Sequence, residues 1–248
     1  MSRKRLSIIA QHLCSAEWLA TYQETSDGVA IITINRPSKL NFLNKEMWDQ
    51  LNSYLLQAES NPNIKVIILA GIGKPFANGE SLPAKEELIA SPVIINDPTD
   101  NWFGQLASMK KPIIAPVNDY VCDEDFEIAM ICDIVIANST ARFVIPKSKM
   151  RLIHGAVGTE SSVKTARKLQ VTELVLVGDV ISADEAKRIG LINKVVENTL
   201  DEAITAAKET ASSPLGDILT AKKAISLYMK QVYQKGSSTN YIYLNKQK

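Results

Sequence analysis

Two short apolar strands separated by an amphipathic helix occupy residues 111–137, and this order constrains the fold more than any other feature of the chain. Residues 113–117 and 134–137 are apolar throughout, as is typical of strands that are buried on both faces of a sheet. A helix that connects two such strands leaves them parallel. The segment therefore predicts a right-handed βαβ unit in a buried parallel sheet.

The same alternation of strand and helix is found earlier in the chain. Residues 29–35 and 65–70 have the β-branched composition of strands. Between them, Asn44 is a suitable N-cap for a helix. Apolar residues follow Asn44 at helical spacing, and they are Met47, Leu51, Leu55 and Ala58. With a further strand predicted over residues 142–145, the fold class is α/β.

The carboxyl-terminal third of the chain has a helical character. Ser182 and Glu185 form a capping box that predicts the start of a short helix, and Gly190 is placed to end it in a left-handed conformation. Two further helices are predicted over residues 203–212 and 217–230. Residues 74–105 have weak periodicity and are predicted to form a long loop with short helical pieces, the kind of segment that often carries function.

Charge and hydropathy give no reason to expect a nucleic-acid or membrane partner. The chain of 248 residues has 28 Lys and Arg against 27 Asp and Glu, so it lacks a basic surface for phosphates. No apolar run reaches the length of a transmembrane helix, and the apolar patch after the basic residues 1–5 is too short for a signal peptide. Three cysteines without metal-ligand spacing (Cys14, Cys122 and Cys132) and only two histidines predict free thiols, no metal site and a reduced, cytoplasmic setting.

An acidic cluster lies where the central helix should begin. Asp123, Glu124 and Asp125 are consecutive, and Glu127 follows inside the helix. A single buried carboxylate at such a place indicates general acid/base chemistry. Acids also stabilise a helix amino terminus, so capping is the structural alternative. Three further carboxylates at the mouth of one site would change the electrostatics of whatever binds there.

Four segments of the chain resemble signatures of the crotonase superfamily, the enoyl-CoA hydratase/isomerase family, in the same order and at similar spacing. Residues 35–44 (NRPSKLNFLN) resemble the family's R-P-x-x-x-N-A-L-N, and residues 76–82 (FANGESL) resemble its F-x-A-G-x-D-L loop. Residues 111–137 resemble its long central signature, and residues 177–196 its T-G-x-x-I-x-A segment. The ordered set is more specific than any one motif, and it runs from about residue 27 to residue 225.

The resemblance implies a spiral of ββα units with a carboxyl-terminal helical region for trimerisation. It divides the chain into an N-terminal extension (residues 1–25), a spiral core (residues 26–197) and a helical region (residues 198–248). Homotrimers, or hexamers built from two trimers, are the assembly expected. The substrate implied is an acyl-CoA or acyl-carrier thioester, with coenzyme A as part of the substrate and no separate cofactor.

The family's chemistry is the stabilisation of a thioester enolate by two backbone N–H groups that form an oxyanion hole. By resemblance, these N–H groups belong to Glu80 and Glu124, the latter at a helix amino terminus. Glu127 matches the first catalytic glutamate of hydratases, and Lys147 replaces the second. Residues of the first two motifs are expected to contact the substrate or its coenzyme A, and they are Lys39, Leu40, Phe42, Ala77, Asn78, Gly79 and Leu82.

The chain departs from the family's pattern at the oxyanion hole itself. The glycines that precede the central helix in the family are Asp123, Glu124 and Asp125 here. Glycine lets a ligand approach the backbone closely, and each new carboxylate would repel an enolate by roughly 1–4 kcal/mol at contact distance. Lys147 is either a new catalytic or carboxylate-binding group or the ion-pair partner of Glu127 and the acidic cluster.

Two functions remain open on these residues. One is a crotonase-type enzyme, a lyase or isomerase, for which two-glutamate hydration is doubtful because only Glu127 is retained. Isomerisation, decarboxylation or another enolate reaction needs fewer proton-handling groups. The other is a catalytically inactive homologue that keeps the fold for a structural or regulatory role.

Overall fold

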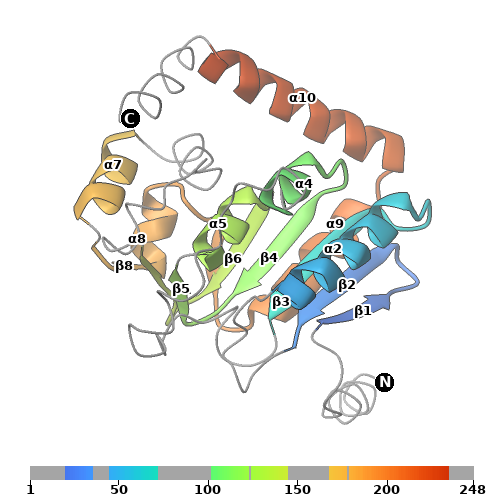
Figure 1. Ribbon diagram of the computed structural model, residues 1–248, viewed down its shortest axis with the longest axis horizontal. Coiled ribbons are helices and arrows are strands. Elements are labelled where there is room, and N and C mark those ends of the chain that lie inside the picture. The colour runs from blue at the N-terminus through green and yellow to red at the C-terminus, as the bar shows by residue number, and fades with distance from the viewer. Residues whose placement is uncertain are drawn as a thin grey trace.

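The structure, a computed structural model, describes residues 20–35, 45–71, 102–122, 124–144, 168–177 and 179–234. In this part of the chain the strands form one six-stranded sheet, with the order β1-β2-β3-β4-β6-β9, and one three-stranded sheet, with the order β5-β7-β8 (Figure 1). The strands are β1 (Ala20–Glu24), β2 (Val29–Ile34), β3 (Val66–Gly71), β4 (Ile113–Val117), β5 (Tyr120–Cys122), β6 (Ile134–Asn138), β7 (Arg142–Val144), β8 (Ile181–Ser182) and β9 (Lys194–Val196).

The large sheet is parallel from β2 to β9, as the sequence predicts. Its one antiparallel member, β1, lies in the segment that the sequence analysis assigned to an N-terminal extension. The register from Ala20↔Ile34 to Glu24↔Ala30 makes β1 a hairpin partner of β2, with Gly28 at a φ of 78° in the connection. The strand has a mixed polar composition because it lies at the edge of the sheet, which is why the pattern of residues 20–24 did not predict it.

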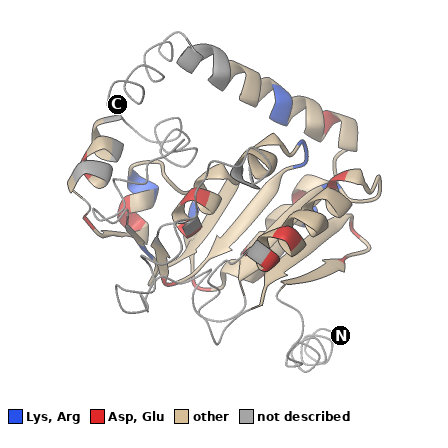
Figure 2. Ribbon diagram, in the orientation of Figure 1, with Lys and Arg blue, Asp and Glu red and all other residues tan. Residues whose placement is uncertain are grey.

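Along the central strands of the large sheet, successive apolar side chains point to opposite faces. On β3, Ile67 and Leu69 belong to the core shared with α2 (Lys45–Ser60), α4 (Trp102–Ser108) and α5 (Glu124–Ile131). Val66 and Ile68 face the opposite side and pack with α9 (Thr199–Ala211). Figure 1 shows these helices covering the sheet on both faces, and Figure 2 shows that the ribbons of β3 and β4 carry no charged residue. This double burial explains the uninterrupted apolar strands.

Two lysines that lie just before strands cap the ends of helices. Lys111, before β4, is 3% exposed, and its Nζ donates to the carbonyls of Ala58 (2.7 Å) and Asn61 (2.6 Å) at the end of α2. Lys65, before β3, donates in the same way to Ala211 O (2.7 Å), where α9 ends. A cation there satisfies carbonyls that have no partner within the helix. Burial lowers the pKa of Lys111, and the nearby carboxylate of Glu59 opposes that shift.

The carboxyl-terminal helices are α7 (Lys168–Val177), α8 (Ala183–Arg188), α9 and α10 (Leu215–Gln234). The predicted N-cap is confirmed, because the side chain of Ser182 accepts from Glu185 N (3.2 Å). Glu185 does not complete the capping box, since its carboxylate accepts from Arg188 Nε (2.7 Å) instead. Gly190 has the predicted left-handed conformation, with a φ of 83°.

The two predicted terminal helices are confirmed with wider bounds. The helix α9 begins four residues earlier than predicted because the Asn198 side chain accepts from Asp201 N and caps it there. Although α9 follows the predicted boundary at residue 198, it packs directly on the large sheet. Within the described residues, no helix combines the length and the apolar character that crossing a bilayer requires.

Candidate active site at the amino terminus of α5

The small sheet continues two neighbouring strands of the large one, β4 and β6. β4 ends at Val117 and β5 begins at Tyr120, while β6 ends at Asn138 and β7 begins at Arg142. β5 and β7 pair in parallel, from Tyr120↔Arg142 to Cys122↔Val144. The chain therefore makes strand–strand–helix units, and α5 begins directly after β5. β7 was predicted from the sequence, whereas β5 was not, because its three residues are too few to form a pattern.

The corner between β4 and β5 is held by contacts to two distant segments. Asp119 has a φ of 51°, the one positive value at a residue other than glycine in the described chain. Its carbonyl accepts from Arg142 N (2.7 Å), at the start of β7. The neighbouring Asn118 Oδ1 accepts from the hydroxyl of Thr199 (3.0 Å), at the start of α9. These contacts fix the direction in which the chain enters β5 and then α5.

The residues on either side of Glu127 anchor α5 in the core. Phe126 and Ile128 are 2% and 0% exposed and belong to the core beside α4. Glu127 lies between them in the sequence and is only half-buried. Glu124 is the first residue of the helix, so its N–H is one of the donors that have no acceptor within the helix. A helix amino terminus with such donors favours an anion.

Asp125 differs from the other acids of the cluster in its surroundings. The sequence analysis grouped it with Asp123 and Glu124 as a carboxylate at the mouth of a site. In the structure Asp125 is only 4% exposed, and both Asp125 and Glu127 make interactions of their own. A carboxylate that is buried in this way needs hydrogen bonds or an opposite charge, so Asp125 has a structural task besides any effect on a ligand.

Comparisons with known proteins agree with this architecture. A model of the family described as enoyl-CoA hydratase/isomerase matches residues 24–246. The mitochondrial enoyl-CoA hydratase of Pongo abelii is 34% identical over 221 residues, which cover 88% of this chain and 76% of that protein. The 2,3-dehydroadipyl-CoA hydratase of Escherichia coli K12 is 32% identical over 213 residues, or 84% and 82% of the two chains. The chain belongs to the enoyl-CoA hydratase/isomerase family.

Solved structures of the same family share the fold. An enoyl-CoA hydratase subunit of Geobacillus kaustophilus superposes with a TM-score of 0.76 at 28% identity, covering 87% of this chain and 84% of that one. A probable enoyl-CoA hydratase of Mycobacterium thermoresistibile gives a TM-score of 0.73 at 26% identity, covering 86% and 87%. The predicted fold class, a crotonase-type α/β fold, is confirmed.

Among the residues predicted to form the oxyanion hole and the acid/base site, the structure describes Glu127 and the backbone of Glu124. The expected second oxyanion donor, Glu80, lies outside the described residues, as does Lys147, which follows the end of β7 by three positions. The predicted substrate-contacting residues also lie outside them, and they are Lys39, Leu40, Phe42, Ala77, Asn78, Gly79 and Leu82. These assignments stay predictions.

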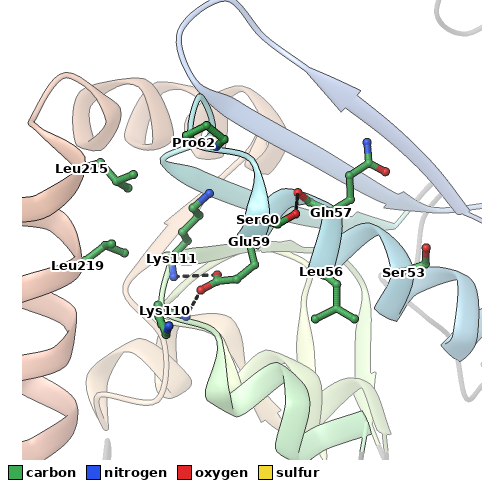
Figure 3. Close-up of a pocket in the computed structure, with 10 residues that line it drawn as sticks. All are labelled: Ser53, Leu56, Gln57, Glu59, Ser60, Pro62, Lys110, Lys111, Leu215 and Leu219. Carbon is green, nitrogen blue, oxygen red and sulfur yellow. Dashed lines mark hydrogen bonds between the residues drawn. The ribbon is translucent and has the colours of Figure 1, made fainter.

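A groove elsewhere on the molecule is not the candidate active site. It has a volume of about 730 Å³ and lies between α2 and the first turns of α10 (Figure 3). Leu56, Leu215 and Leu219 give it apolar walls. Glu59 lies in it, but its carboxylate is occupied by the backbone N–H groups of Lys110 and Lys111. The groove lies where strands begin, whereas ligands of open α/β sheets bind beyond the carboxyl ends of the strands.

Metal ligands and thiols are two other kinds of group that can carry chemistry in a protein. No three His, Cys, Asp or Glu side chains of the described residues come together as metal ligands would. Cys132 is free, as predicted, and the structure shows that it is buried. Burial and the adjacent Asp133 raise the pKa of its thiol, which opposes formation of the nucleophilic thiolate.

Proposed function

We propose that this protein is a crotonase-type enzyme that binds an acyl-CoA thioester and stabilises its enolate. The observation that carries the proposal is the position of Glu127, which projects half-buried from α5 one turn after the first residue of that helix. The same helix thus offers an acid/base group and, at Glu124, a backbone donor for a developing anion. Similarity to hydratases over most of the chain supports the same substrate class.

The proposed reaction is one that a single glutamate can serve. Glu127 removes a proton from C2, next to the thioester carbonyl, and returns it at C4, while the N–H groups of Glu80 and Glu124 bind the oxygen of the dienolate formed between the two steps. Lys147 replaces the second glutamate of hydratases, so isomerisation of a double bond is favoured over addition of water. A role for Lys147 near Glu127 is part of this proposal, and the register Cys122↔Val144 supports it to the extent that the strand ends preceding the two residues are paired. Coenzyme A enters only as part of the substrate.

The test compares Glu127→Gln with Glu209→Gln, an equal change at an exposed position of α9. Short and medium 2-enoyl-CoA and 3-enoyl-CoA substrates are supplied, and absorbance of the conjugated thioester is followed, with products identified by mass spectrometry. We expect conversion of 3-enoyl-CoA to 2-enoyl-CoA, unchanged in Glu209→Gln and lowered at least about 100-fold in Glu127→Gln. Equal rates in the two variants would remove Glu127 from the mechanism.

The second candidate is an inactive homologue, which is favoured by the acidic residues where the family has glycine. It predicts that acetoacetyl-CoA neither binds in calorimetry nor raises the melting temperature, whereas the enzyme proposal predicts micromolar binding. The double change Glu124→Gly with Lys147→Glu tests whether these two departures from the family's pattern suppress hydration. If they alone suppress hydration, hydratase activity should appear in this variant, and a folded but inactive variant would mean that other residues block it.

We also propose that the protein assembles as a homotrimer or as a hexamer. Support comes from the outer half of α10, where Ile225 and Tyr228 are 66% and 67% exposed. Apolar side chains gathered on one exposed helix indicate a surface that is covered by a partner. A second copy of the chain is the proposed partner, in keeping with the helical trimerisation region that the family resemblance implies.

A further inference from the structure

One ammonium group ties α10 to the start of two neighbouring strands of the large sheet, β4 and β6. Lys222 Nζ donates to Asp133 Oδ2 (2.6 Å) and to the carbonyl of Lys111 (2.9 Å). Lys111 precedes β4 and Asp133 precedes β6. The same oxygen, Asp133 Oδ2, accepts from Ile113 N (2.8 Å). The three groups therefore form one continuous hydrogen-bonded unit at the edge of the sheet where its strands begin.

This unit is partly shielded from solvent. The Lys222 side chain is 17% exposed and that of Asp133 is 30% exposed. The ammonium also makes a charge-assisted bond to a backbone carbonyl, which is stronger than a bond between neutral groups. Loss of the lysine would leave that carbonyl and the carboxylate short of a partner, and such a loss costs more than a solvated pair contributes.

Lys222 also marks the point where α10 leaves the body of the protein. Ile218, one turn earlier on the same side of the helix, is 7% exposed, whereas Ile225, about one turn later, is 66% exposed. All side chains of residues 223–228 are exposed. Figure 1 shows α10 starting beside α2 and α9 and ending well away from the sheet. Within the described side chains of α10, Lys222 is thus the outermost that is anchored.

We propose that Lys222, Asp133 and the Lys111 carbonyl form a latch that holds α10 to the sheet, and that breaking it frees the helix beyond Ile218 while the sheet stays folded. The latch fixes the direction in which α10 projects and hence where its exposed apolar residues are presented. The latch contains no residue of the candidate active site. This proposal therefore does not depend on whether the protein converts a thioester.

The experiment measures backbone hydrogen exchange by mass spectrometry on the full chain, at one protein concentration for all variants. Lys222→Met removes the ammonium and keeps an apolar stem. Lys223→Met is the matched control, because it makes the same change one residue along the helix at an exposed position. Asp133→Asn removes the charge but keeps an oxygen for Ile113 N. Peptides that cover β4 and β6 report whether the sheet remains intact.

We expect exchange in residues 219–234 to be about tenfold faster in Lys222→Met than in Lys223→Met, with β4 and β6 unchanged. Asp133→Asn should act in the same direction, and the double variant should exchange no faster than Lys222→Met, because both changes remove one ion pair. Two results would overturn the latch. One is equal exchange in the two lysine variants, and the other is faster exchange in β4 and β6 as well as α10, which indicates general destabilisation.

Discussion

At the scale of single residues, Asp119 shows how the corner before α5 is built at a conformational cost. Its φ of 51° lies in the left-handed region, which is unfavourable for residues that carry a Cβ. Aspartate tolerates this region better than most residues. Its carboxylate also accepts from the Thr140 hydroxyl, although the distance of 3.3 Å makes that bond weak. The backbone conformation, and not the side chain, is therefore the main requirement at this position.

This requirement predicts an order of stabilities for two variants at the same position. Asp119→Gly removes the side chain and relieves the positive φ, whereas Asp119→Ala removes the same carboxylate but keeps a Cβ. The glycine variant should be more stable than the alanine variant by about 1 kcal/mol in free energy of unfolding. Reversible urea unfolding at a fixed protein concentration measures this difference. Equal stabilities would mean that the corner relaxes to a negative φ.

Residues whose task depends on near neighbours were predictable from the sequence, and residues with distant partners were not. Ser182 caps a helix through a residue three positions away, so its motif is visible in the chain. Lys111 instead caps a helix that ends about 50 residues earlier, and Lys222 bonds to residues 89 and 111 positions away. No local pattern records such contacts, because the fold brings the partners together.

At the scale of elements, α9 depends on small residues to approach the sheet. Ala203, Ala207 and Ala211 are 0%, 0% and 4% exposed, and they pack over apolar residues of four strands, including Ile68, Ile114 and Ile136. The spacing of four keeps the three alanines on one side of the helix. Since interiors are close-packed, this contact leaves little room for a larger side chain.

Ala207→Leu should therefore destabilise the protein by about 1–3 kcal/mol through overpacking. Thr205→Leu is the control, because it adds a leucine to an exposed position of the same helix and should change the free energy of unfolding by no more than about 0.5 kcal/mol. Urea unfolding of both variants beside the unchanged protein gives the two differences. Similar small effects in both would show that α9 can move away from the sheet without loss.

Elements buried on two faces were the easiest to predict, and edge elements the hardest. β3 and β4 are apolar throughout, and β6 is apolar up to its last residue, Asn138, because helices cover both sides of the sheet. β1 and β5 lack such a pattern, since one is an edge strand and the other has only three residues. At the candidate site, the sequence indicated Glu127 and the helix start at Glu124 through family motifs, but the burial of Asp125 depends on tertiary packing that no motif contains.

At the scale of the whole molecule, the outer part of α10 raises the question of what covers it. Ile225, Leu227 and Tyr228 are 66%, 49% and 67% exposed, and they lie beyond Lys222, the outermost anchored residue among the described side chains of α10. Exposed apolar side chains this close together are costly in water. If a second copy of the chain buries them, they will contribute much to assembly and little to the stability of a single folded chain.

The combined change Ile225→Ser and Tyr228→Ser tests whether these side chains serve assembly and not the stability of a single folded chain. We expect the mass measured by light scattering after size-exclusion chromatography to fall from that of a trimer or hexamer towards that of a monomer. Because both side chains are exposed within one chain, far-ultraviolet circular dichroism should keep its native shape. Lys223→Ser, a control in the same stretch of α10, should leave the mass unchanged. An unaltered mass in the double variant would place the assembly contacts elsewhere, and a monomeric mass for the unchanged protein would rule out the proposed assembly altogether.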